Sequence, residues 1–157
     1  MAKTHFKKAT MFSLLYSLFW IPMNVISNLM SDVEEKNGLG DIGFWDLAVI
    51  YLFQAGGSVV ASAIISKYGL IKSMVVGSLL NCMMCGSSFL SSMRLSSDSN
   101  QDGWHISKET IIVALLSTSA ISGFGQALTS VVQGEYIALC ATEQTKGFYF
   151  GYYWFIF

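Results

Sequence analysis

Charged residues are scarce in this sequence, and their signs nearly cancel. Only 12% of the residues are charged, 53% are hydrophobic, and the formal net charge is −1. A nucleic-acid-binding protein needs a concentrated basic surface, which a few scattered lysines and arginines do not provide. This composition excludes nucleic acid as a partner. A mean hydropathy of +0.52 is too high for an ordinary soluble domain of this size, and it predicts that the chain lies in a lipid bilayer.

Motifs that carry chemistry are also missing. The chain has no H-E-x-x-H, no G-x-S-x-G and no pair of aspartates within an apolar stretch. Cys82 and Cys85 form a C-x-x-C, but a second such motif and clustered histidines, which a zinc site would need, are lacking. We therefore predict that the protein is not an enzyme and binds no cofactor or metal. We interpret Cys82, Cys85 and Cys140 as inert thiols buried among apolar side chains.

Four apolar stretches are long enough to cross a membrane, because a hydrocarbon core about 30 Å thick takes about 20 helical residues. They are residues 11–30, 44–65, 70–93 and 110–140. The fourth carries no formal charge from Ile111 to Val132. A fifth apolar stretch, residues 147–157, has about half of the required length. The sequence therefore predicts an all-α fold with one membrane domain over residues 1–157, a polytopic transmembrane helix bundle with four spans and an incomplete fifth.

The lysines of the short connections indicate the orientation of this bundle. Several of them precede residue 11, Lys67 and Lys72 flank the connection between the second and third stretches, and Lys36 is alone in the first loop. Because basic residues are retained on the cytoplasmic side of membranes, we expect the N-terminus on the cytoplasmic or matrix-equivalent side. The sequence leaves the membrane open, with an organellar inner membrane as one candidate.

Polar side chains recur inside the predicted spans. On the first span, polar residues follow one another at intervals of three, four and seven, which places them on one helix face. Glu135 is expected to be the one carboxylate near the interior of a span. Such groups form either a cavity for a ligand or interhelical hydrogen bonds that hold the bundle together. The candidates for these two roles are Asn24, Asn28, Gln54, Asn81, Gln126, Gln133 and Glu135.

Small residues form a nearly continuous ridge along the fourth span. They follow one another at steps of three or four residues, so that they share one face of a helix. Another helix can approach closely along such a face. This predicted helix-packing face consists of Ser119, Gly123, Ala127, Ser130, Gly134 and Ala138.

The same region carries a family resemblance, which spans nearly the whole chain and is most specific from Gly123 to Trp154. The segments that carry it are Gly123-x-Gly125, Gln133-Gly134-Glu135-Tyr136-Ile137, Cys140-Ala141-Thr142-Glu143 and Gly147-Phe148-Tyr149-Phe150-Gly151-Tyr152-Tyr153-Trp154. They resemble the fourth-to-fifth-helix region of the Unc-ninety-three-like proteins, also called ion channel regulatory proteins, a branch of the major facilitator superfamily. The resemblance implies the N-terminal half of a major facilitator fold. Members of this family are known mainly as regulators or trafficking partners of other membrane proteins, and some have proposed transport roles.

Two functions are consistent with these observations. Alternating access in the facilitator superfamily takes two six-helix halves, and the stretches found here match one incomplete half. We therefore expect a non-catalytic integral membrane protein, a regulatory or structural accessory subunit whose partners are the lipid bilayer and other membrane-protein subunits. The alternative is the N-terminal part of a facilitator-type solute transporter, whose cavity would collect the amides named above.

Overall fold

The chain is all-helical in the part that its computed structural model describes, residues 2–98 and 107–157. These residues form five α-helices and no β-strand. The helices are α1 (Ala2–Lys36), α2 (Ile42–Tyr68), α3 (Leu70–Asp98), α4 (Lys108–Cys140) and α5 (Lys146–Ile156). Three of them are long and apolar enough to cross a membrane, namely α1 from His5 to Lys36, α2 and α4. The all-α prediction is therefore confirmed.

The helices differ from the predicted spans mainly at their ends. The first runs to Lys36, past the predicted end of the first span at residue 30, and so includes the acidic residues Asp32, Glu34 and Glu35. The third helix continues to Asp98. The part of it with described side chains, Leu70–Gly86, is apolar but shorter than a full span. A fourth full span over residues 70–93 therefore stays a prediction. Residues 94–109, between the third and fourth stretches, are polar and predict a connection in water. Residues 99–106 of this connection lie outside the described residues.

The connection between α2 and α3 is a single residue. Gly69 has a φ of +86°, a backbone conformation that glycine adopts without strain from a Cβ atom. Its N–H donates to the carbonyl oxygen of Ile65 at 2.8 Å, which closes the last turn of α2. The next residue, Leu70, begins α3, so the two helices form an antiparallel hairpin.

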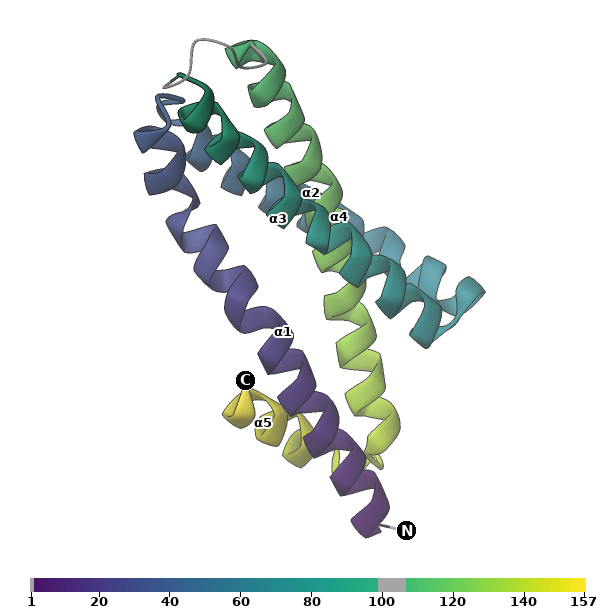
Figure 1. The fold of residues 1–157 in the computed structure, drawn as a ribbon. Coiled ribbons are helices and arrows are strands. Elements are labelled where there is room, and N and C mark those ends of the chain that lie inside the picture. The colour runs from purple at the N-terminus through teal and green to yellow at the C-terminus, as the bar shows by residue number, and fades with distance from the viewer. Residues whose placement is uncertain (1, 99–106) are drawn as a thin grey trace.

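Helices α2, α3 and α4 form the packed centre of the bundle. The α2–α3 hairpin crosses α4 at a steep angle (Figure 1). Glycines permit the close approach: a Cβ atom on Gly123 would clash with the backbone of Ile50 on α2. One on Gly77 of α3 would lie 2.9 Å from the carbonyl oxygen of Gly125 on α4. Small residues at helix crossings bring backbones into dispersion contact, which lipid does not supply by a hydrophobic force.

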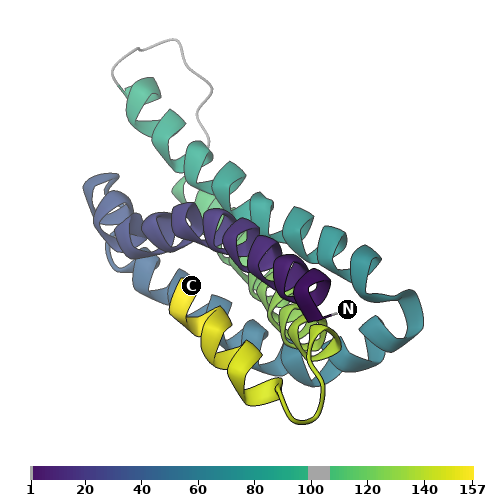
Figure 2. The ribbon, with the colours of Figure 1, turned by 90° about the horizontal axis from the view of Figure 1, so that it is seen from below.

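Aromatic residues join α5 to the first half of α1. The view from below shows the two helices running alongside one another (Figure 2). Tyr153, which is 1% exposed, has its ring centroid 6.1 Å from that of Tyr16 on α1. Phe6 lies against Tyr152, with ring centroids 4.9 Å apart. This second core positions α5 across the lower end of the bundle, where α1 and α4 approach each other (Figure 1).

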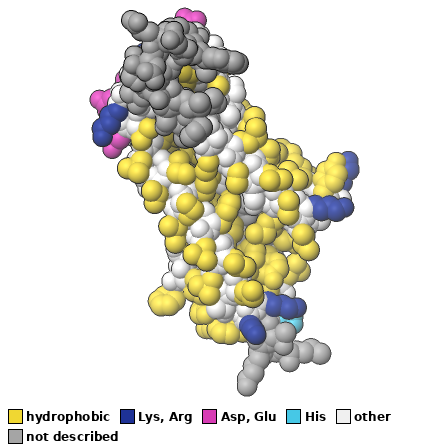
Figure 3. Space-filling view, viewed as in Figure 1, with side chains coloured by type: hydrophobic (Ala, Val, Ile, Leu, Met, Phe, Trp, Pro, Cys, Tyr) yellow, Lys and Arg dark blue, Asp and Glu magenta, His cyan; other side chains and the backbone are white. Residues whose placement is uncertain are grey.

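The surface separates apolar from charged side chains. In the view of Figure 3, hydrophobic side chains cover the middle of the molecule, and Lys, Arg, Asp and Glu side chains lie toward its edges. Val59 and Ile71 are each 81% exposed although they are fully apolar. An apolar surface of this extent marks contact with a membrane or with another protein.

Candidate functional site

A buried polar layer lies between α3 and α4. The Oγ of Ser122 donates to the Oδ1 of Asn81 at 2.8 Å. The Nε2 of Gln126 donates to the same oxygen at 3.4 Å. The close contact of Gly77 with Gly125 sets this register, because Asn81 follows Gly77 by one turn and Ser122 precedes Gly125 by three residues on the antiparallel helix.

Only part of the predicted polar set meets in this layer. Asn81 and Gln126 are in contact, as one of the two predicted roles requires, whereas Ser122 was not among the candidates. Asn24 and Asn28 are exposed on α1, and Gln54 is half-buried on α2. Gln133 is buried on α4, two turns beyond Gln126. The predicted residues thus do not line one common cavity in the part of the chain that the structure describes.

The predicted packing face of α4 divides into two halves. Ser119, Gly123 and Ala127 are buried, and Gly123 and Ala127 lie against Ile50 and Gly57 of α2. Beyond them Ala61 and Ile65 of α2 still form a buried apolar cluster with Leu128 and Val132 of α4, but the predicted face itself is more open. Ser130, Gly134 and Ala138 are half-buried, and a Cβ atom added to Gly134 would meet nothing within 4 Å.

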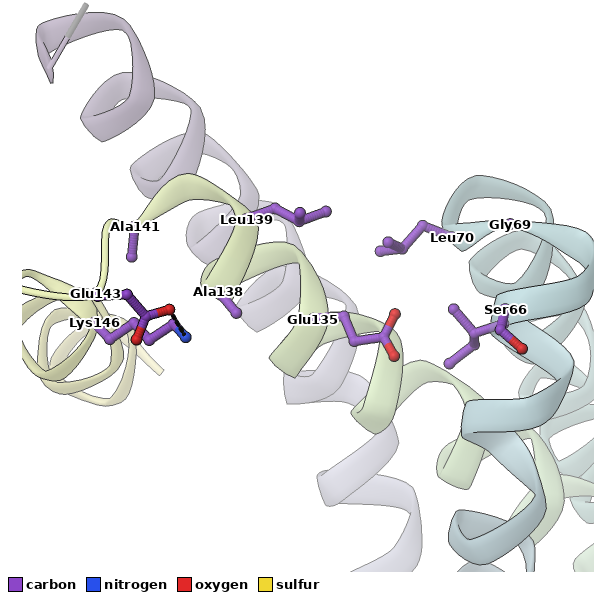
Figure 4. Close-up of a pocket in the computed structure, with 10 residues that line it drawn as sticks. Ser66, Gly69, Leu70, Glu135, Ala138, Leu139, Ala141, Glu143 and Lys146 are labelled. Carbon is purple, nitrogen blue, oxygen red and sulfur yellow. Dashed lines mark hydrogen bonds and ion pairs between the residues drawn. The ribbon is translucent and has the colours of Figure 1, made fainter.

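An open groove separates the lower half of α4 from the α2–α3 hairpin. It has a volume of about 620 Å³. Glu135 is half-buried in it and points toward Ser66 on α2 (Figure 4). On the other side, the Nζ of Lys146 donates to the Oε1 of Glu143 at 2.6 Å. The groove therefore combines apolar walls with three ionisable side chains, and the basic one is paired with an acid.

Two further carboxyl groups lie at the opposite end of the bundle. Glu34 near the end of α1 and Asp46 near the start of α2 are both fully buried. Glu135 is therefore not the most buried carboxyl group of the described bundle, and its place near the interior of a membrane span stays a prediction. Asp46 falls at the start of the second predicted span, residues 44–65. The signal that identifies it is its position after Phe44 and Trp45, within the second apolar stretch.

The cysteines do not lie where they were expected. Cys82 and Cys85 are exposed on α3, and Cys140 is half-buried. The prediction that all three are buried is wrong, because the face of α3 opposite α4 is open. All three thiols are free. Within residues 2–98 and 107–157, no group of three or more His, Cys, Asp or Glu side chains is placed to hold a metal ion.

The comparisons with known proteins return no relative. No protein-family model, curated protein or solved structure matches this chain. The resemblance to the Unc-ninety-three-like proteins therefore stays a prediction from the motifs of α4 and α5.

Proposed function

We propose that this chain is an integral membrane protein without catalytic activity, which contributes helices to a larger membrane assembly as a regulatory or structural subunit. The observation that carries the proposal is the exposure of Asn24 and Asn28 on α1. These two amides lie one turn apart in a helix that is long and apolar enough to cross a membrane. Ile21 and Val25 beside them are 59% and 51% exposed, so the amides stand in an otherwise apolar surface.

An amide on this surface needs a partner if α1 lies in lipid. Hydrocarbon offers no hydrogen bond, and burying an amide there without one costs about 2–7 kcal/mol. Polar residues in spans accordingly face other helices or water. A helix from another membrane-protein subunit, packed against α1, would satisfy both amides and cover the apolar residues around them.

The test compares the two asparagines with an exposed apolar control. We expect native mass spectrometry from mild detergent to show the chain in a complex of fixed stoichiometry with another integral membrane protein. The double variant Asn24→Leu/Asn28→Leu should reduce the complexed fraction at least tenfold. Val59→Leu on α2 is the control, because it changes an exposed apolar residue far from the asparagines and should leave the complex intact. A chain that remains a folded monomer in both wild type and variants overturns the proposal.

The second candidate is the N-terminal part of a facilitator-type solute transporter. It is favoured by the same two asparagines, which would then line a water-filled path. Cysteines introduced at positions 24 and 28, in a chain whose own three cysteines are replaced by serine, separate the two functions. Rapid reaction with a membrane-impermeant thiol reagent indicates a water-filled path, and protection indicates a packed helix interface. A transporter should also show saturable uptake that is lost in Asn24→Ala or Gln126→Ala.

A further inference from the structure

The carboxyl group of Asp46 is held in an unusual place. It lies in the second turn of α2, is 0% exposed, and neither of its oxygens has a hydrogen-bond partner. A carboxylate that has lost water and meets neither a cation nor a donor is strongly unfavourable. A buried site of this kind favours the protonated carboxyl group, because that form carries no net charge into the interior.

Helix α4 places a second buried polar side chain, that of Ser119, beside the Asp46 carboxyl group. Gly123 on α4 lies against the backbone of Ile50 on α2. Ser119 and Asp46 each precede that contact by one helical turn, which sets them side by side. Ser119 is also 0% exposed, and its Oγ has no well-aligned hydrogen bond although it neighbours the Asp46 carboxyl group. A hydroxyl group can donate to a carboxyl oxygen or accept from a protonated one, so it suits both forms of Asp46.

The third helix at this end brings a second acid. Ser31 of α1 lies against Gly43 of α2 so closely that a Cβ atom on the glycine would clash with it. Glu34, one turn further along α1, is fully buried and close enough for its charge to act on Asp46. Two negative charges at this distance repel in a dry interior. A proton on one of the two acids removes the repulsion and lets three helices stay packed.

No other ionisable side chain is buried beside this pair in the part of the chain whose side chains the structure describes. Among the residues with described side chains, the charged ones at the same end of the bundle are all exposed. They are Asp32, Glu35 and Lys36 on α1, Asp41 before α2, and Lys108 and Glu109 at the start of α4.

We propose that Asp46 is a proton-binding site that controls the packing of α1 and α4 on α2. In the packed arrangement Asp46 is a neutral acid. When its O–H bond breaks, the proton leaves to water at this end of the bundle, and the carboxylate that remains repels Glu34. The ends of α1 and α4 then separate from α2 until water reaches the charge. Proton binding at Asp46 does not depend on the proposed role of this chain as a subunit of a membrane assembly.

The titration of Asp46 can be measured directly. We would record carboxyl carbon signals by NMR on the full chain in lipid nanodiscs, with ¹³C-labelled aspartate and all the other aspartates replaced by asparagine. The expected result is a signal that is still protonated at a pH at which the exposed Asp41 is ionised in the matched chain that keeps Asp41 alone. If the two residues titrate together, the proposal is overturned. The Asp46 signal itself is recorded in a chain that keeps Asp46, and only the exposed reference residue is recorded in a chain that carries Asp46→Asn.

The proposed separation of the helix ends is tested by measuring the distance between α1 and α4. Spin labels on Val33→Cys in α1 and Lys108→Cys in α4, in a chain without its own cysteines, report the separation of these ends. We expect the separation to increase with pH in the wild type and to stay at its low-pH value in Asp46→Asn, which is permanently neutral. Glu35→Gln is the control and should respond to pH as the wild type does.

Sodium ions distinguish a proton from a metal cation. The distance would be measured at high pH with either sodium or N-methylglucamine as the only monovalent cation. We expect the same wide separation in both solutions. A separation that sodium alone restores to its low-pH value would mean that Asp46 binds a metal cation, and it would overturn the assignment to a proton. A separation unaffected by pH overturns the control of packing.

Discussion

Single atoms decide how closely these helices pack. The Oδ1 of Asn81 accepts from both Ser122 and Gln126, while the Nδ2 of the same side chain is buried without a partner. A polar layer of this kind stabilises a bundle only as long as its donors and acceptors are matched. Substitution of Asn81 should therefore disturb the α3–α4 interface.

Replacing Asn81 by alanine should destabilise the fold more than replacing Ser122. Asn81→Ala removes the one acceptor that two buried donors share, and it leaves both of them to be satisfied elsewhere. We expect a loss of about 1–3 kcal/mol in the free energy of unfolding. Ser122→Ala removes a single donor and should cost about 0.5–1.5 kcal/mol. Equilibrium unfolding in mixed detergent measures both, and an equal or larger effect of Ser122→Ala would contradict the shared role of Asn81.

Gly123 and Gly134 provide a matched pair on the same face of α4. A methyl group at Gly123 would clash with the backbone of Ile50, whereas one at Gly134 meets open space. We expect Gly123→Ala to lower the free energy of unfolding by about 1–3 kcal/mol, as overpacking does. Gly134→Ala should raise it by up to about 1 kcal/mol, because alanine is the better helix former.

The two glycines also test the position of the crossing itself. The same unfolding experiment measures both variants, and circular dichroism checks that each remains helical. If Gly134→Ala is as destabilising as Gly123→Ala, then a neighbouring helix lies against Gly134 and the open space found at this residue is wrong.

At the scale of elements, apolar stretches were sufficient to predict the helices but not their ends. Each of the five helices corresponds to a stretch identified from hydrophobicity. The helices extend past the apolar residues because polar residues can continue the backbone hydrogen bonds of a helix. The first stretch becomes a helix that reaches Lys36, and it carries Glu34 into the interior.

The candidate site was predicted less completely than the fold. A helical period shows that Asn81 and Gln126 face inward, but it does not show on which turn of α4 a residue of α3 falls. That register is fixed by the contact of Gly77 with Gly125. Ser122 could therefore be assigned to the buried layer only with this helix crossing in view.

Tyr153 is the most deeply buried aromatic side chain in the contact between α5 and α1. Tyr153 is 1% exposed and faces Tyr16 on α1, whereas the next residue, Trp154, is 64% exposed. Tyr153→Ala leaves a cavity between α5 and α1, and large-to-small aromatic substitutions in cores cost about 3–5 kcal/mol. An eleven-residue helix has little stability of its own, so we expect α5 to lose protection from hydrogen exchange while α4 keeps it.

Trp154→Ala is the control for this element. It removes a side chain of similar size from the exposed face and should leave the exchange of α5 unchanged. Equal deprotection by the two substitutions would mean that contact with α1 does not hold α5 in place.

At the scale of the whole molecule, charge and length together define a topology. The acids near the α1–α2 connection and the lysines of the α2–α3 hairpin lie at opposite ends of α2, which is 27 residues long and apolar enough to cross a membrane. Because α1 and α2 are antiparallel, the start of α1 lies toward the same end as the hairpin. If α1 and α2 both cross the bilayer, then Lys8 and Lys67 share one side and Lys36 is on the other.

This topology can be tested by labelling single cysteines in sealed vesicles. Lys8→Cys, Lys36→Cys and Lys67→Cys would each be made in a chain whose own cysteines are replaced by serine. We expect an impermeant thiol reagent to reach positions 8 and 67 from the same side and position 36 from the opposite side. The lysine-rich ends should lie on the cytoplasmic side, because moving several cations across the bilayer during insertion is unfavourable. Labelling after the vesicles are opened confirms that each thiol is reactive. If positions 36 and 67 are both labelled from the same side of the membrane, α2 does not span it. The apolar surface of the bundle must then be covered by other proteins.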